Sequence, residues 1–399
     1  MRIETMETLS FKFRTHDAEF KVQSPPSSFG ILNLCPKCLF ALCFCSNFLY
    51  SHLQFEKSRK GAEMVSLTVK LLLTVFLQSL RNPLVLLSKF PWRRSPVTRK
   101  PKPIALPQNS PLERIPSNSW DSHMHVIDPV NYPLAKDAQY VPKQHLLSEA
   151  LKFESTVRIR NVVLVQPSIY DYDNSCMLDA LRLLGPQRAR AVVAFDPNTT
   201  TLSTLQEWHS IGVRGVRVNL HSVGKSMDAS QLDIILHQYA DMIRPLNWVL
   251  QLHVSIAATT ALEKIVPQLG VRVCLDHFAR PALPENVSPY STTSNPYLLP
   301  GFKSLVNLLE QKDTFVKMSA PYRISKETDL CDLEPVAKEL LRVAGRTRIV
   351  FATDWPHTRF EGLDISSFLE KVLEWCGEDE ALIERLFRSN AEDLWDVRA

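Results

Sequence analysis

Two histidines, His123 and His125, stand two residues apart in the apolar segment 119–127. In a β-strand, side chains alternate between the two faces, so residues i and i+2 point the same way. Two neutral imidazoles on one face are the beginning of a divalent-metal site. An isolated His-x-His is common as a surface or core accident. A metal site is favoured over a chance pair here because further His and Asp residues follow at the ends of later apolar segments.

Eight short apolar segments of strand character follow one another from residue 119 to the C-terminus, and segments with helical spacing of Leu and Ile separate them. This alternation predicts an α/β fold, a (β/α)₈ TIM barrel. An open, doubly wound sheet is the alternative, but no Gly-x-Gly-x-x-Gly follows the first segment. The predicted strands are 119–127, 161–166, 191–195, 215–220, 248–253, 271–276, 315–319 and 349–353.

Polar residues gather where these predicted strands end. In a TIM barrel the C-terminal ends of the strands meet at one rim, which carries the active site. Taken singly, most of these residues fit a bland role: Asp276 a helix cap, His253 a packed histidine, the arginines solvated side chains. Their convergence on one rim predicts a site. The candidates are His123, His125, Ser168, Arg217, His253, His277, Arg280, Tyr322, Arg323, Asp354 and His357.

The imidazoles of His123, His125 and His253, together with one carboxylate, suit zinc or manganese with an open position for water. Such a metal lowers the pKa of its bound water to roughly 7 and polarises a substrate carbonyl. The carboxylate is Asp354, which is placed both to bind the metal and to take the proton of the water as general base. His277 is the predicted second acid/base group, or a donor to the developing oxyanion.

Three arginines at one rim, Arg217, Arg280 and Arg323, predict a small anionic substrate that carries carboxylates, because guanidinium groups bind carboxylates in a bidentate manner. Supplementary hydrogen-bond partners for the substrate are Ser168, Tyr322 and His357.

Residues 1–118 differ from the rest and are predicted to be an irregular, partly apolar extension before a domain at 119–399. The segments 31–50 and 64–87 are apolar, and 91–116 reads as a linker rich in proline and basic residues. The apolar segments fit a membrane anchor, a targeting segment or an amphipathic helix. Another interpretation is that Met64 is the true start.

Hydrophobic content of 45% and charged content of 22% are those of an ordinary globular protein. The net charge of +4 is small, and much of the basic excess lies in the linker. We therefore expect no nucleic-acid partner. The cysteines of the main domain have no zinc-site spacing and read as reduced thiols. We expect a cytoplasmic protein, with membrane or mitochondrial association through residues 31–90 as the alternative.

Four motifs together resemble the amidohydrolase-related family of the amidohydrolase superfamily, and most closely its 2-pyrone-4,6-dicarboxylate lactonase-like barrels. The resemblance covers residues 119–399 and implies hydrolysis of a carboxylated lactone. It implies that Asp354 activates water, His277 polarises the lactone carbonyl, and the arginines and Ser168 contact the substrate. The motifs are Asp121-Ser-His-Met-His-Val126, Asp276-His-Phe-Ala-Arg-Pro281, Ser319-Ala-Pro-Tyr-Arg323 and Thr353-Asp-Trp-Pro-His357.

His253 departs from the metal-free lactonases, which lack a histidine on the fifth strand. It is closer to the metal-dependent members, so the resemblance implies a metal, with a metal-free mechanism as the alternative. It also keeps open a second reaction, non-oxidative decarboxylation of an aromatic or unsaturated acid. A third hypothesis, from another class, is a catalytically silent barrel that only binds a ligand or partner.

Overall fold

The computed structural model describes residues 12–15, 18–21, 110–219, 228–284 and 295–397. The chain divides into two compact units, residues 1–102 and 103–399. In the first unit, strands β1 (Lys12–Thr15) and β2 (Ala18–Lys21) pair antiparallel. The predicted apolar segments of the extension lie outside the described residues. No helix in the described part of the chain is both long and apolar enough to span a bilayer.

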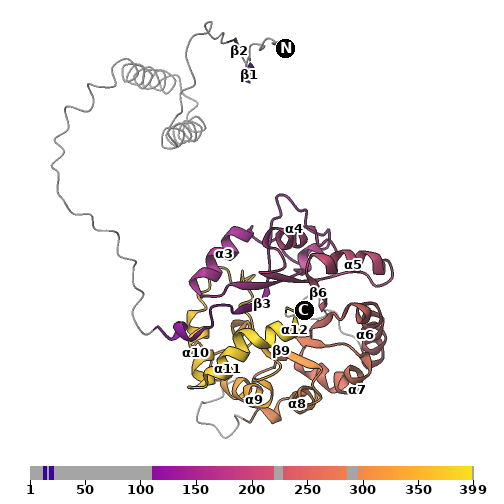
Figure 1. Cartoon of the computed structure of the whole chain (residues 1–399), viewed down its shortest axis with the longest axis vertical. Helices are drawn as coiled ribbons and strands as arrows, with labels where there is room; N and C mark the ends of the chain where they lie inside the picture. Colours follow the sequence, from indigo (N-terminus) through magenta and orange to yellow (C-terminus); the bar gives the residue numbers. More distant parts are fainter. Residues whose placement is uncertain (1–11, 16–17, 22–109, 220–227, 285–294, 398–399) are drawn as a thin grey trace, which may run out of the picture. The chain divides into compact units, whose positions relative to one another are not determined.

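Eight parallel strands in chain order, β3 to β10, form the sheet of the second unit, and helices surround it (Figure 1). Each strand pairs with the next along the chain, as the register Arg217↔Gln251 between β6 and β7 illustrates. The predicted TIM barrel is confirmed, and every predicted strand overlaps an observed one. The strands are β3 (Trp120–Met124), β4 (Asn161–Val165), β5 (Ala189–Val193), β6 (Val213–Asn219), β7 (Val249–His253), β8 (Val273–Leu275), β9 (Thr314–Met318) and β10 (Ile349–Phe351).

The first and last strands of the barrel meet at a seam. The His125 N–H donates to the Trp355 carbonyl at 2.8 Å, and the Asp354 N–H donates to the His123 carbonyl at 2.9 Å. The buried carboxylate of Asp121 accepts the backbone N–H groups of His123 and Thr353, each at 2.9 Å. The seam therefore fixes the backbone on both sides of the candidate site.

A second buried carboxyl, Glu154 of helix α3 (Leu147–Thr156), lies beside Asp121. Burial, with the neighbouring Asp121 carboxylate as a smaller contribution, raises the pKa of Glu154 well above its usual range. The folded protein therefore holds the proton of Glu154 to a higher pH than the unfolded chain, which ionises this group above about pH 4.3. Ionisation in the unfolded chain alone lowers stability as the pH rises from about 4.3 towards the folded-state pKa.

We expect Glu154→Gln to remove this part of the pH dependence. Between pH 5 and pH 8 the Tm of the wild type should fall about 2–4 °C further than the Tm of the variant. A difference of this size corresponds to about 1 kcal/mol in domains of 150–250 residues. Thermal unfolding followed by circular dichroism measures this. The control is Glu310→Gln, which changes an exposed glutamate at the end of helix α8 (Phe302–Glu310). The explanation is wrong if both variants keep the wild-type pH profile.

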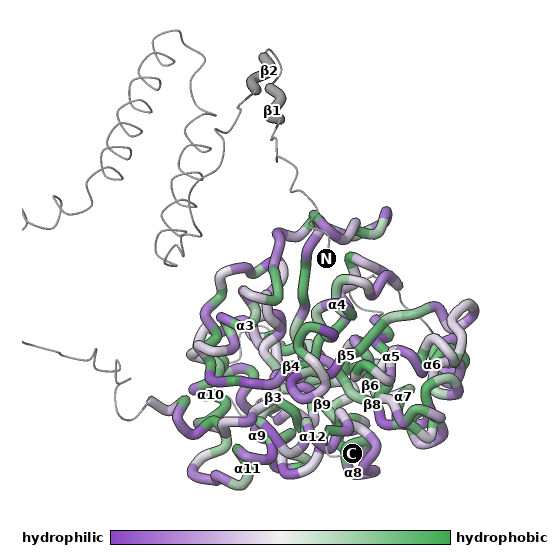
Figure 2. The backbone as a smooth tube through the Cα atoms, turned by 45° about the horizontal axis from the view of Figure 1, so that its top comes forward, coloured by the Kyte–Doolittle hydropathy of each residue, from purple (hydrophilic) through white to green (hydrophobic). Residues whose placement is uncertain are grey.

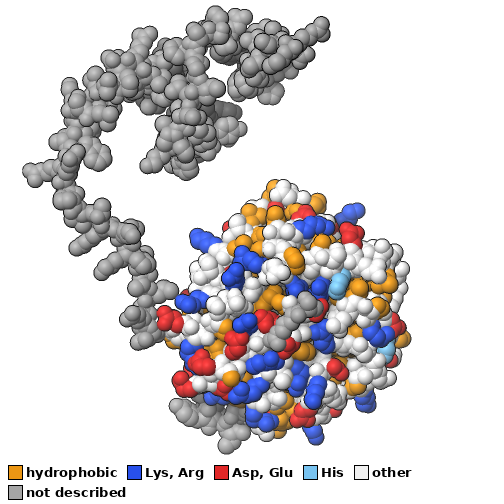
Figure 3. Space-filling model, viewed as in Figure 1, with side chains coloured by type: hydrophobic (Ala, Val, Ile, Leu, Met, Phe, Trp, Pro, Cys, Tyr) orange, Lys and Arg blue, Asp and Glu red, His pale blue; other side chains and the backbone are white. Residues whose placement is uncertain are grey.

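The helices bury the leucines whose spacing predicted them, such as Leu181 on α4, Leu236 on α6 and Leu305 on α8. On the face shown in Figure 3, acidic and basic side chains of the barrel are interspersed. The helices are α3 (Leu147–Thr156), α4 (Ser175–Leu184), α5 (Leu202–Ile211), α6 (Ala229–Ile243), α7 (Thr259–Leu269), α8 (Phe302–Glu310), α9 (Glu334–Ala344), α10 (Ser366–Cys376), α11 (Glu380–Glu384) and α12 (Asn390–Leu394).

The interior of the barrel holds a small core of its own. Inward side chains of the strands, including Val192, Val249 and Phe315, pack with Trp395 just after α12. The indole N–H of Trp395 donates to Ser122 Oγ at 3.2 Å. Hydrophobic stretches follow the central strands in Figure 2, and α12 lies near the middle of the barrel in Figure 1. Trp395 therefore closes one end of the barrel interior and leaves the other for polar side chains.

Residues just before the predicted domain boundary at 119 pack on the barrel. A short 3₁₀ helix, η1 (Pro111–Arg114), precedes the buried Ile115. Arg114 donates to Glu380 at 2.7 Å and to the Gly377 carbonyl at 2.6 Å. The packed part of the chain thus includes residues from 110 onward.

Candidate active site

A cavity of about 200 Å³ lies at the C-terminal ends of the strands. It brings together eight predicted residues: His125, Ser168, Arg217, His253, His277, Arg280, Arg323 and Asp354. Four residues that the sequence reasoning did not single out, Tyr140, Pro167, Thr358 and Arg359, complete its lining.

Three predicted site residues lie outside this lining. His123 is fully buried below it and reaches Asp354. Tyr322 contacts the site through its hydroxyl, which donates to Asp354 Oδ2 at 2.7 Å. His357 lines a neighbouring cavity of about 290 Å³, together with His145. Its ring packs perpendicular to that of Tyr322, with centroids 5.6 Å apart, so its contact with a substrate stays a prediction.

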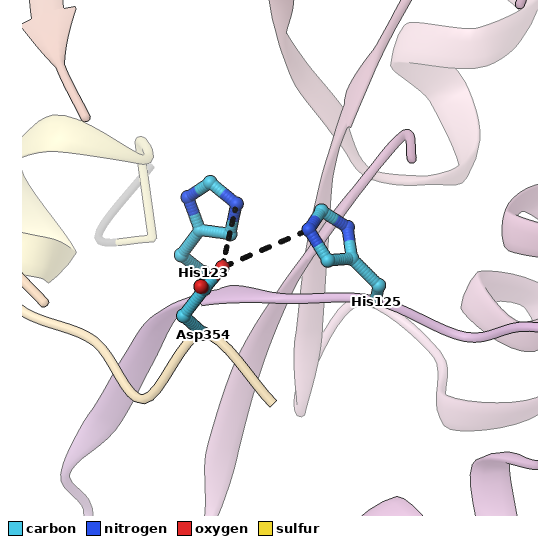
Figure 4. A group of neighbouring side chains, drawn as sticks. All are labelled: His123, His125 and Asp354. Carbon is cyan, nitrogen blue, oxygen red and sulfur yellow. Dashed lines mark ion pairs between the residues drawn. The ribbon is translucent and has the colours of Figure 1, made fainter. Parts of the chain in front are cut away.

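Three imidazoles converge on one carboxylate oxygen. The Nε2 atoms of His123, His125 and His277 lie 3.6, 3.8 and 3.8 Å from Asp354 Oδ1. Figure 4 shows His123 and His125 both directed at this carboxylate, as their spacing on one strand predicted. The seam brings Asp354 to them from the opposite end of the barrel sequence.

The geometry fits a divalent metal. Ligand atoms of His123, His125 and Asp354 all lie within 4.8 Å of one another. Tetrahedral zinc with bonds of about 2.0–2.1 Å places its ligand atoms about 3.4 Å apart, close to the distances here. His125 Nδ1 donates to the Val165 carbonyl at 2.8 Å, which leaves the Nε2 lone pair to face the site. His253 does not belong to this group, so its assignment as a ligand stays a prediction.

The protonation states suit this arrangement. Burial lowers the pKa of His125 and of His277 to about 4, so both are neutral at pH 7. Burial alone would raise the pKa of Asp354, but attraction to neighbouring groups, among them the cationic Arg323 guanidinium, outweighs burial and holds that pKa well below its usual range. Arg323 Nε donates to Asp354 Oδ2 at 2.9 Å, opposite the oxygen that faces the imidazoles.

A buried polar network supports the site from below. Lys317 Nζ donates to Gln251 Oε1 at 2.6 Å and lies 3.4 Å from Asp276 Oδ1 and 3.2 Å from His123 Nδ1. Asp276 Oδ2 accepts from Arg217 Nη2 and from Gln251 Nε2, each at 3.2 Å. The sequence alone would have allowed Asp276 to be a helix cap. In the structure its carboxylate instead balances the charges of two buried cations.

Sequence reasoning missed Lys317, although a signal existed: a lysine in the middle of an apolar predicted strand is rarely buried unless it is paired. It also missed Arg359, whose guanidinium lies 4.6 Å above the Tyr140 ring at the cavity wall. Both residues of that pair lie in loops beyond strand ends, where no periodic pattern points to a site.

Known proteins show the same architecture. The amidohydrolase family model matches residues 120–397. The 4-sulfomuconolactone hydrolase of Hydrogenophaga intermedia is 31% identical over 251 residues, which are 62% of this chain and 77% of that protein. The 2-pyrone-4,6-dicarboxylate hydrolase of Comamonas testosteroni is 26% identical over 259 residues, 62% of this chain and 80% of that protein.

Among solved structures, a putative 2-pyrone-4,6-dicarboxylic acid hydrolase from Pseudomonas putida superimposes with a TM-score of 0.59 at 26% identity. The match covers 71% of this chain and 100% of that one. The chain therefore shares its barrel fold with that structure, and it belongs to the amidohydrolase family.

Proposed function

We propose that this amidohydrolase-family hydrolase opens the ring of a small carboxylated lactone. One observation carries the proposal: an ionised Asp354 faces three neutral imidazoles in a cavity that four arginines line. The names of two relatives, 4-sulfomuconolactone hydrolase and 2-pyrone-4,6-dicarboxylate hydrolase, support the substrate class.

His123, His125 and Asp354 are the residues that would hold a divalent cation, zinc by preference and manganese as the alternative. When bound, the cation would acidify water and polarise the lactone carbonyl. Asp354 Oδ1 orients the water and accepts its proton, then returns it to the leaving oxygen. His277, whose Nδ1 lies 2.8 Å from Ser319 Oγ, holds its other nitrogen towards the reacting carbonyl.

The arginines divide into two kinds. Arg217 and Arg323 each pair with a carboxylate of the site, at 3.2 and 2.9 Å. Arg280 and Arg359 line the cavity without an ion pair to any described residue. These two guanidinium groups are therefore the ones left to bind carboxylates of the substrate.

We expect Arg280→Met to raise KM for 2-pyrone-4,6-dicarboxylate about 10–100-fold and to change kcat by less than about threefold, because a charge-assisted hydrogen bond contributes about 1.5–3 kcal/mol. Steady-state kinetics measures both. Arg182→Met on α4 is the control: it removes an exposed arginine that pairs with Asp179 outside the site. An equal KM for the two variants would count against a substrate-binding Arg280.

The proposed reaction is tested by its product. The full chain is incubated with 2-pyrone-4,6-dicarboxylate or 4-sulfomuconolactone, with zinc, with manganese, or with a chelator. Mass spectrometry that finds one added water, the ring-opened acid, supports the proposal. Release of carbon dioxide from an aromatic or unsaturated acid, without lactone opening, would replace it with the decarboxylase. Inertness towards both classes would favour a barrel that only binds.

A further inference from the structure

His253 at the end of β7 lines the cavity, and its Nδ1 lies 3.4 Å from Arg217 Nη2. A guanidinium group has hydrogens to donate and no lone pair to offer. In this contact Nδ1 of His253 is therefore the acceptor. A neutral imidazole has a single N–H, so the proton of His253 is on Nε2.

Arg217 is held in this orientation by the rest of the barrel. Its Nε and Nη2 donate to Asp276 Oδ2 at 3.3 and 3.2 Å, and its Nη1 donates to the Gln166 carbonyl at 3.3 Å. The Arg217 side chain is 6% exposed and the Asp276 side chain is fully buried. To turn Arg217 away from His253 would break these bonds and leave a buried cation poorly compensated.

His125 shows the opposite arrangement. Its Nδ1 donates to a backbone carbonyl at 2.8 Å, so Nε2 carries the lone pair that a metal requires. Nδ1 of His253 faces the cationic Arg217 guanidinium, where Nδ1 of His125 faces a carbonyl. Its ring stands perpendicular to that of His277, at 88° with centroids 5.1 Å apart, in the same wall of the cavity.

We propose that His253 donates its Nε2–H to the carbonyl oxygen of the lactone and is not a metal ligand, with Arg217 as the positioning residue that fixes its tautomer. The proposal rests on the proposed function for the identity of the acceptor. The tautomer and the ligand set do not depend on that function and are measured without a substrate.

The first test is nitrogen NMR of the full chain with ¹⁵N-labelled histidine rings, in which the His253 signals are identified by their loss in His253→Gln. We expect an unprotonated Nδ1 and a protonated Nε2. Added zinc should shift the signals of His125 and leave Nε2 of His253 protonated. An unprotonated Nε2, or one that loses its proton when zinc is added, overturns the proposal whether or not the protein arrives with a metal.

The second test compares His253→Gln, whose amide N–H can take the place of Nε2–H, with His253→Leu. We expect kcat on 2-pyrone-4,6-dicarboxylate to fall by less than about tenfold in the Gln variant and by about 10²–10³-fold in the Leu variant, the loss typical of one donor to a developing oxyanion. Zinc content by plasma mass spectrometry should match the wild type in both, while His123→Ala loses it. Equal loss of activity and of zinc in both His253 variants would make His253 a ligand.

If the wild type opens no lactone but the NMR result holds, the tautomer stands and the proposed function fails. If the wild type is active but Nε2 is unprotonated, the function stands and this inference fails.

Discussion

Replacement of Asp354 by Asn should lower kcat for lactone opening by about 10³-fold, within the 10²–10⁴-fold range typical of a lost general base. The amide keeps the volume of the side chain but cannot take a proton from water. The substitution also removes the negative charge of the carboxylate, whose Oδ2 accepts hydrogen bonds from Arg323 Nε at 2.9 Å and from the Tyr322 hydroxyl at 2.7 Å. Initial rates with 2-pyrone-4,6-dicarboxylate measure the loss.

Tyr322→Phe is the matched control, because it removes one hydrogen bond to Asp354 and leaves the carboxylate in place. We expect it to cost less than about tenfold in kcat, in line with about 1 kcal/mol for one hydrogen bond. Circular dichroism of both variants checks that the fold is kept. An Asn variant that turns over like the wild type would show that another group activates the water.

The second large effect concerns stability. Asp276→Asn should lower the free energy of unfolding by about 3–5 kcal/mol, because it leaves the buried cations of Arg217 and Lys317 without their shared carboxylate. Both cations lie within hydrogen-bonding or ion-pair distance of Asp276, at 3.2 and 3.4 Å. Equilibrium denaturation in urea measures the loss.

Two comparisons make this result specific. Asp179→Asn breaks an exposed ion pair on α4 and should cost less than about 1 kcal/mol. Addition of Lys317→Met to Asp276→Asn should recover part of the stability, since one uncompensated charge is then gone. If Asp276→Asn costs no more than Asp179→Asn, the network does not hold the barrel interior together.

The sequence predicted the barrel and most of the residues that line its cavity, because both depend on local patterns. Strands covered on both faces read as apolar runs, and the alternation of side chains placed His123 and His125 on one face. The conserved geometry of a TIM barrel then puts strand ends at one rim. These rules need no knowledge of which side chains meet.

What could not be predicted depends on contacts between distant segments. His357 follows a turn in which Asp354 and His357 both have positive φ, 64° and 57°, and its side chain lines the neighbouring cavity. The type of such a residue does not determine the sign of its φ angle. Likewise, the role of His253 depends on Arg217 from the neighbouring strand, and Lys317 is explained only by partners on other strands.

The seam between β3 and β10 also bears on how the protein is made. Asp121 and Thr353, which it joins, lie 232 residues apart, and Trp395, which closes the other end of the barrel, comes later still. During synthesis the ribosome releases β3 long before its partner exists. Until β10 is made, one edge of β3 has no partner strand. The growing chain then contains His123 and His125 but lacks the Asp354 carboxylate that faces them. A chain cut short before residue 354 would therefore lack the carboxylate that faces His123 and His125.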